Sequence, residues 1–180
     1  EWGIPLHVNP VSLIRKPKAP RPRNRRLEAG ELERLLHFNS CLNSWFKPVV
    51  LFAIETGMRR GEILSLTWEH VHLGKRYVHL PDTKNGDSRD VPLSPVALKL
   101  LRDLPRNISS DQVVFPLHYE ALKSAWGRAC KRAGITNLRF HDLRHTHATI
   151  MLLQGVHPKI VQERLGHSKM STTMDLYSHV

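Results

Sequence analysis

Several features that mark familiar protein classes are missing from this chain of 180 residues. Its two cysteines, Cys41 and Cys130, form no CxxC motif and no framework of pairs, which predicts two small, buried thiols in a reducing cytoplasm. No apolar run approaches the roughly 18–20 residues that span a bilayer, and the first charged cluster is followed by more charge rather than by the apolar core of a signal peptide. We therefore expect neither a membrane anchor nor secretion.

Clustered carboxylates and glycine-rich phosphate loops are missing as well. A nuclease or transposase that works with Mg²⁺ needs two or three acidic ligands close together, and no such grouping stands out. Neither a Walker motif nor a dinucleotide fingerprint is present. We expect no metal and no cofactor, so any phosphoryl transfer by this chain has to conserve the energy of the substrate bond.

Positive charge is what the sequence has in excess. It carries 27 Lys and Arg against 16 Asp and Glu, a formal net charge of +11, which favours a polyanion such as DNA as partner and exceeds what solubility requires. The excess is concentrated near the start, where prolines keep the chain extended between seven basic residues: Arg15, Lys16, Lys18, Arg21, Arg23, Arg25 and Arg26. We interpret residues 1–26 as a basic, proline-rich linker or arm that binds DNA.

Residues 27–180 retain 20 basic and 15 acidic residues and have the pattern of one mostly helical domain. The spacing of apolar residues predicts helices from about 27, over 45–56 and over 59–66. Short strands are expected at 77–80 and 90–93, joined by the hairpin signal Asn85-Gly86, in an antiparallel sheet of two or three strands. Further helices are expected at about 94–103, 119–133, 141–154, 158–165 and 171–178.

Two local signals for chemistry lie in the first half of this domain. In the segment TGMRRGEIL, Arg59 follows a glycine break at a helix start and can point its guanidinium at an anion, while Glu62 lies one turn on and can hold Arg59. The same pair is also typical of a surface salt bridge. Lys84 stands beside the Asn85-Gly86 turn, where it is either a solvated charge or a group that reaches across a bound ligand.

Two further signals lie in the second half. In HDLRHTHA, His141 and Arg144 are one helical turn apart and project together, so they offer an imidazole and a bidentate guanidinium to a phosphate. Histidines at such spacings can also bind metal, although no carboxylate or cysteine completes a site here. In LGHS, a glycine before His167 permits a tight turn, and Tyr177 follows as either a packing aromatic or a nucleophile. Together the four signals predict a phosphoryl-transfer site of fixed cations with a tyrosine nucleophile.

The order of the motifs TGMRRGE, TKNG with RDVPL, HDLRHTHA, LGHS and TTMDLYSH resembles the catalytic domain of tyrosine site-specific recombinases, the phage integrase family. The resemblance covers nearly the whole chain, and residues upstream resemble the join to a core-binding domain. It implies an α+β fold, mostly α with a small antiparallel three-stranded sheet, for a catalytic domain at 27–180. It also implies a fragment without the N-terminal core-binding domain, in keeping with Glu1 in place of an initiator Met.

The resemblance further implies a role for each residue. Arg59 and Arg144 correspond to the two arginines that clamp the phosphate, and Glu62 corresponds to the acidic residue that supports the first of them. His141 corresponds to the histidine of the family's HxxR motif and His167 to the histidine of its LGH motif. Which of the two histidines accepts the tyrosine proton stays open at this point.

By the same resemblance, Lys84 is the general acid toward the leaving 5′-oxygen. Tyr177 is the nucleophile that forms a 3′-phosphotyrosine and releases a 5′-hydroxyl, without a metal ion. It follows His167 by ten residues, where nine is commoner in the family, so we expect the loop at 168–171 to absorb one residue.

The expected partners are double-stranded DNA carrying a recombination site and other protomers in a synaptic tetramer, while the fragment alone is expected to be a monomer in the bacterial cytoplasm. Two alternatives remain open. A type IB topoisomerase relaxes supercoils with a similar residue set, and recombination between two DNA sites would distinguish it. A catalytically idle DNA-binding relative would suit the positive arm and body equally well.

Overall fold

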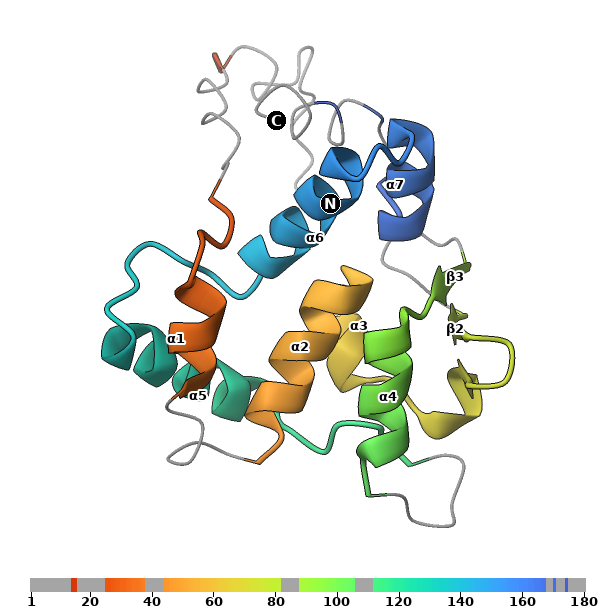
Figure 1. The fold of residues 1–180 in the computed structure, drawn as a ribbon, viewed down its shortest axis with the longest axis horizontal. Coiled ribbons are helices and arrows are strands. Elements are labelled where there is room, and N and C mark those ends of the chain that lie inside the picture. Colours follow the sequence, from red (N-terminus) through yellow and green to blue (C-terminus); the bar gives the residue numbers. More distant parts are fainter. Residues whose placement is uncertain are drawn as a thin grey trace, which may run out of the picture.

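A central helix, α2 (Phe46–Thr56), organises the fold. The computed structural model describes residues 14–15, 25–37, 44–81, 88–105, 112–167, 170 and 174. In it α2 lies in the middle of the body and packs against three other helices, α3, α4 and α6 (Figure 1). The remaining helices are α1 (Glu31–His37), α3 (Arg60–Leu64), the 3-10 helix η3 (Trp68–His70), α4 (Pro95–Asp103), α5 (Tyr119–Arg132), α6 (Asp142–Leu153) and α7 (Pro158–Leu165).

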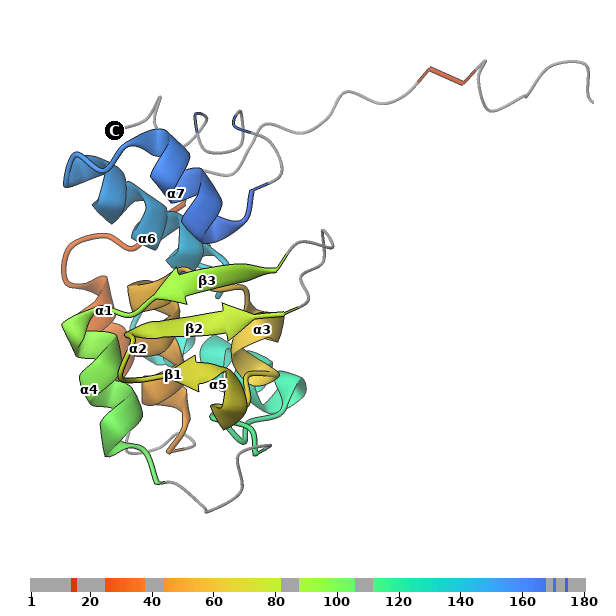
Figure 2. The same cartoon turned by 90° about the vertical axis from the view of Figure 1, so that its right-hand side faces the viewer.

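A small antiparallel sheet lies on one side of the helices. Its strands are β1 (Val71–His72), β2 (Tyr77–Leu80) and β3 (Arg89–Pro92), in the order β1-β2-β3. Val78 pairs with Val71 and with Val91, and this row of side chains is buried against the core. Figure 2 shows β3 as the strand nearest α7, against which it packs. The predicted fold class, mostly α with a small antiparallel sheet, is confirmed.

Most element boundaries agree with those expected from the sequence to within one residue, and two helices differ by more. The first helix begins at Glu31 rather than near residue 27, because Gly30 directly before it has φ +76°, outside the right-handed helical region. Helix α3 is shorter than 59–66, and β3 begins at Arg89. The Asn85-Gly86 turn, Cys41 and, apart from Met174, the helix expected at 171–178 lie outside the described residues.

Aromatic rings fill the core on both sides of α2. Phe52 packs on Phe115 with ring centroids 5.2 Å apart, and Trp126 packs edge-on against Phe140 at 5.3 Å. Cys130 is buried in the same core. Burial raises the pKa of its thiol to about 11, which makes the thiol unreactive. Within the described part of the chain, no helix is long and apolar enough to cross a membrane.

Helices α6 and α7 approach the end of α2 very closely at Gly57. This residue ends α2 in the left-handed conformation, with φ +64°. A Cβ added to it would lie 2.6 Å from Cδ2 of His147 on α6 and 2.7 Å from a methyl carbon of Leu165 on α7. Only glycine satisfies both the backbone conformation and the space, so this position sets how near the two helices come to α2.

Replacing Gly57 by alanine tests this close approach. We expect Gly57→Ala to lower the free energy of unfolding by about 2–4 kcal/mol, since left-handed strain and overpacking add. Gly134→Ala is the matched control, because Gly134 has φ +65° but open space around a Cβ, and only strain of about 1 kcal/mol is expected there. Equal losses in urea denaturation would show that the contact with α6 and α7 contributes nothing.

Candidate active site

Arg59 is held in place at the start of α3. It occupies the N-cap with an extended backbone, and its N–H donates to Oε2 of Glu62 at 2.7 Å. Its guanidinium donates from Nη1 to Oε1 of Glu62 at 2.8 Å and from Nη2 to the carbonyl oxygen of Gly166 at 2.8 Å. The contact that the i,i+3 spacing predicts is therefore present, and the Glu62 carboxylate also caps the start of α3 by accepting the Arg59 N–H.

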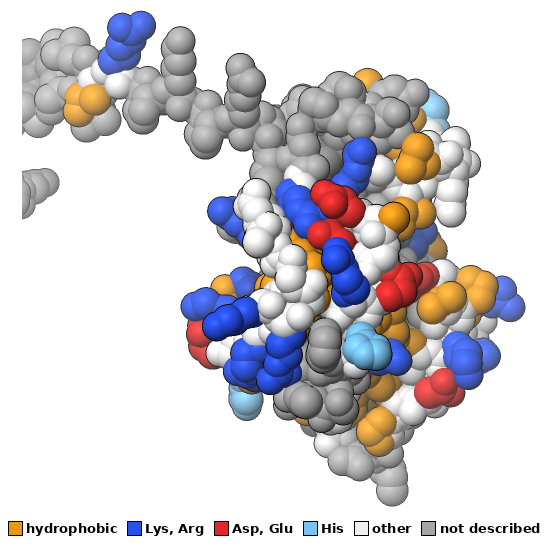
Figure 3. Space-filling view, turned by 60° about the vertical axis from the view of Figure 1, so that its left-hand side comes forward, with side chains coloured by type: hydrophobic (Ala, Val, Ile, Leu, Met, Phe, Trp, Pro, Cys, Tyr) orange, Lys and Arg blue, Asp and Glu red, His pale blue; other side chains and the backbone are white. Residues whose placement is uncertain are grey.

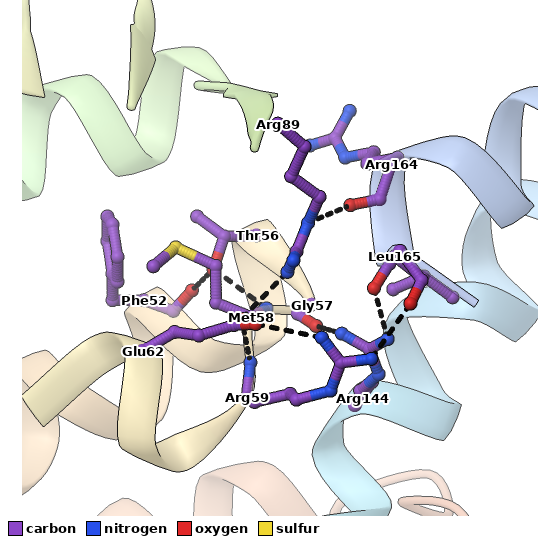
Figure 4. Close-up of polar contacts among 11 residues, drawn as sticks. Phe52, Thr56, Gly57, Met58, Arg59, Glu62, Arg89, Arg144, Arg164 and Leu165 are labelled. Atoms are coloured by element: carbon purple, nitrogen blue, oxygen red, sulfur yellow. Dashed lines mark hydrogen bonds and ion pairs between the residues drawn. The ribbon is translucent and has the colours of Figure 1, made fainter. Parts of the chain in front are cut away.

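Glu62 is shared between two arginines. Its Oε2 also accepts from Nη2 of Arg89 at 2.7 Å, so Arg59 and Arg89 bind one carboxylate from opposite sides (Figure 4). Burial alone raises the Glu62 pKa, but hydrogen bonds from Arg89 and Arg59 outweigh burial and leave that pKa lowered. Glu62 is therefore ionised at neutral pH, and it neutralises only one of the two guanidinium charges.

Arg144 lies in the first turn of α6 and is 3% exposed. Its Nη1 donates to the Gly57 carbonyl at 2.7 Å, and its Nη2 donates to the Leu165 carbonyl. These oxygens lie at the C-terminal ends of α2 and α7, where the helix dipoles favour a cation. Burial, and then the charge of Arg59, lower the Arg144 pKa to about 9, so it remains a cation at neutral pH.

Two histidines complete the cluster in their neutral form. His141 is the N-cap of α6 rather than a residue inside the helix, and its ring lies edge-on to that of His145, with the centroids 5.3 Å apart. Desolvation at its ring, and then the charge of His145 and Arg144, lower the His141 pKa to about 4. Burial, and then the charges of Arg144 and Arg59, lower the His167 pKa to about 3. Each imidazole can therefore accept a proton or hydrogen-bond a phosphate at neutral pH.

The other residues of the predicted site are not all described. Lys84, Tyr177, the loop at 168–171 apart from Met170, and four arm residues (Lys16, Lys18, Arg21 and Arg23) lie outside the described residues. Of the rest of the arm, Arg15 is exposed. Arg25 instead donates from Nη2 to Glu31 at 2.6 Å, so its charge is engaged with the body. In the ranges that are described, no three His, Cys, Asp or Glu side chains are grouped to hold a metal ion.

Comparison with known proteins identifies the family. The family model described as the phage integrase family matches residues 25–180. This chain belongs to the phage integrase family. It is 46% identical to the shufflon-specific DNA recombinase of Escherichia coli over 81% of this chain and 37% of that protein. It is 31% identical to the tyrosine recombinase XerA of Saccharolobus solfataricus over 94% of this chain and 58% of that protein.

Solved structures agree with this assignment. The crystal structure of XerA recombinase superimposes with a TM-score of 0.71 at 26% identity, covering 91% of this chain and 62% of that one. The catalytic domain of bacteriophage HP1 integrase superimposes with a TM-score of 0.70 at 28% identity, covering 87% of this chain and 88% of that one. The family and the fold predicted from the motifs are thus confirmed. The chain spans roughly a third to three fifths of the length of the two curated relatives.

Three residues of this integrase-family site carry contacts that the sequence did not reveal. Arg89 stands in the RDVPL motif, where it received no role, yet it binds Glu62. His145 stacks on His141. Arg164, which reads as an ordinary basic residue in the last turn of a helix, donates from Nη2 to the Glu55 carbonyl at 3.2 Å. The HDLRHTHA motif offered a signal for His145, whereas nothing local distinguishes Arg89 and Arg164 from surface cations.

His147 provides a pH test of this packing. Its Nδ1 donates to the Ile54 carbonyl at 2.7 Å, and burial, followed by the charge of Arg164, lowers its pKa from 6.5 to about 4. The unfolded chain therefore binds the proton first as pH falls. We expect the neutral His147 side chain to contribute on the order of 3 kcal/mol to the free energy of unfolding above pH 6.5. This contribution is lost as the pH falls toward 4.

Urea denaturation between pH 7 and pH 4 measures this contribution. The His147→Asn variant should show a shallower decline in the free energy of unfolding than the wild type, since Asn can donate to the Ile54 carbonyl without titrating. His118→Asn, at an exposed histidine, is the control and should keep the wild-type slope. Equal slopes for His147→Asn and the wild type would refute the assignment.

Proposed function

We propose that this chain cleaves and rejoins DNA strands at specific sites through a covalent 3′-phosphotyrosine at Tyr177. One observation carries the proposal: two arginines from separate parts of the chain, Arg59 and Arg144, bind the Gly166 and Leu165 carbonyls directly before His167. His141 lies one turn before Arg144 at the start of the same helix. Family membership supports it, because the relatives of this chain carry the names recombinase and integrase.

The two arginines suit a phosphate that gains negative charge. A guanidinium has five N–H donors, and the hydrogen bonds described above use two on each side chain, which leaves donors for a ligand. Both side chains are anchored before DNA arrives, so little reorganisation is needed when the pentacovalent transition state forms. Removing one such donor typically costs about 10²–10³ in rate.

In the proposed first step, the Tyr177 hydroxyl oxygen attacks the scissile phosphorus. The bond between Tyr177 Oη and phosphorus forms as the bond between phosphorus and the 5′-oxygen breaks. A base takes the tyrosine proton, and Lys84 supplies one to the leaving 5′-oxygen. In the second step a 5′-hydroxyl attacks the phosphotyrosine and releases the tyrosine. Because one phosphoester replaces another in each step, no external energy source is required.

His141 and His167 are the candidate bases. Their pKa values of about 4 and about 3 keep both neutral in the absence of substrate. A bound DNA phosphate places negative charge beside them, which raises both pKa values and makes the imidazoles stronger bases. The site then gains basicity when the substrate is in place, while the buried arginines keep it cationic without it.

The proposed partners are double-stranded DNA and further protomers that assemble with it, in the compartment that holds the DNA. The formal net charge of +11 supports a polyanionic partner. On the face drawn in Figure 3, groups of Lys and Arg side chains lie around smaller groups of Asp and Glu. We further propose that residues 1–26 follow the DNA backbone as a basic arm.

A covalent adduct tests the central proposal. Duplex DNA with a bridging 5′-phosphorothiolate at a recombination site traps the phosphotyrosine, because the sulfur leaving group cannot attack efficiently in reverse. The wild type should give an SDS-stable adduct in the presence of EDTA, and Tyr177→Phe should give none.

The control and the contrary outcomes separate the alternatives. Tyr77→Phe removes a hydroxyl from β2 instead and should leave adduct formation intact. No adduct from the full-length protein on its cognate site would favour an idle DNA-binding relative. An adduct accompanied by relaxation of supercoils, without recombination between two sites, would favour a topoisomerase.

The proposed arm predicts a steep response to salt. Replacing five arm cations by glutamine (Arg15, Lys16, Lys18, Arg21 and Arg23) should reduce the slope of log affinity against log salt by up to about 4.5, since each lost phosphate contact contributes about 0.9. Fluorescence anisotropy with labelled duplex measures the slope. An unchanged slope would show that the arm does not lie on DNA.

A further inference from the structure

Arg89 is a largely buried cation beside the site, and the proposed reaction does not use it. We propose that Arg89 is a positioning residue, which orients Arg59 through Glu62 and fixes the turn that precedes His167. This inference rests on the proposed function, because its effect is read in the cleavage step. It adds to the site a residue that acts through other side chains rather than on the reacting groups.

The first contact of Arg89 determines how Glu62 is oriented. Oε2 of Glu62 accepts two hydrogen bonds at 2.7 Å, one from the Arg59 N–H and one from Nη2 of Arg89. With Oε2 held in this way, Oε1 is aimed at Nη1 of Arg59. Without Arg89 the carboxylate loses one of these anchors and can rotate about its last torsion, which is broad in glutamate. The guanidinium of Arg59 then loses its fixed direction.

The second contact of Arg89 is with the turn at the end of α7. Its Nε donates to the Arg164 carbonyl at 3.3 Å. Its guanidinium also packs on Gly166, which has φ +64°, and a Cβ there would lie 3.0 Å from Nη1 of Arg89. The Gly166 carbonyl in turn accepts from Arg59. Arg89, Glu62, Arg59 and Gly166 therefore form a closed ring of contacts, and His167 is the next residue. Figure 4 shows Arg89 and Arg59 meeting at Glu62.

The burial of Arg89 argues against a role in stability alone. Its side chain is 10% exposed, and its Nη1 is buried with no hydrogen-bond acceptor among the described residues. A desolvated guanidinium with an unsatisfied donor costs stability, and an apolar side chain of similar size often serves a purely structural role as well or better. The charge also lowers the pKa of Arg144, so its field reaches the proposed phosphate site.

Three variants at this position separate positioning from packing. Arg89→Lys keeps the charge, Arg89→Gln keeps hydrogen bonding, and Arg89→Met keeps only bulk. The rate of adduct formation under single-turnover conditions at saturating DNA, the DNA dissociation constant and the melting temperature are measured separately. We expect Arg89→Gln and Arg89→Met to slow adduct formation about 10- to 100-fold. DNA affinity should change less than about threefold, and Arg89→Lys should recover part of the rate, since lysine keeps the positive charge beside the Glu62 carboxylate as well as a donor.

A double-mutant cycle with Glu62→Gln tests whether Arg89 acts through Glu62. If it does, Arg89→Gln combined with Glu62→Gln should be little slower than the slower single variant. Arg102→Gln, at an exposed arginine on α4, is the control and should keep the wild-type rate. Should Arg89→Gln fail to fold by circular dichroism, Arg89→Lys decides: a slower rate at unchanged melting temperature supports positioning.

Several results would overturn the inference. These are fully additive effects in the cycle, a wild-type adduct rate in folded Arg89→Gln or Arg89→Met, or a loss confined to DNA affinity. A wild-type protein that forms no adduct would overturn the proposed function, and with it this inference. A wild type that reacts while Arg89→Met reacts equally fast would overturn the role of Arg89 alone.

Discussion

The carbonyl groups at the C-terminal end of α2 are bound by side chains from two later helices, and the site depends on this contact. His147 donates to the Ile54 carbonyl, Arg164 to that of Glu55 and Arg144 to that of Gly57. The last turn of a helix leaves such acceptors unsatisfied, and its dipole favours cations there. These hydrogen bonds hold both α6 and α7 against the end of α2. Helix α3 begins only a few residues further along the chain.

This arrangement concentrates positive charge around a single carboxylate. Arg59, Arg89 and Arg144 interact with Glu62, which can neutralise only one of them. Buried cations tolerate one another here because main-chain carbonyls from the ends of α2 and α7 accept from Arg144. The surplus charge destabilises the fold but suits a phosphate, so the structure holds in advance the electrostatic field that the proposed transition state needs.

Local patterns predicted much of the fold, and the exceptions have physical causes. Apolar spacing and glycine breaks predicted α2 and its end at Gly57, because those signals act within a few residues. The i,i+3 rule likewise predicted the contact of Arg59 with Glu62. The same reasoning placed His141 inside a helix where it is the cap, and it assigned Arg25 to the arm although Arg25 binds Glu31. Side-chain partners that end an element are not visible in its periodicity.

The sequence by itself determined the family, the mostly helical fold and the residue types of the site, because motif order and local spacing are written along the chain. Only the tertiary structure decided which cations work together. Arg89 meets Glu62 across 27 residues, and it meets the Arg164 carbonyl across 75. No local rule favours these pairs over solvent exposure of the same side chains. They form because β3 packs on α7 and α7 lies against the end of α2, so water is excluded and each guanidinium finds its acceptors within the protein.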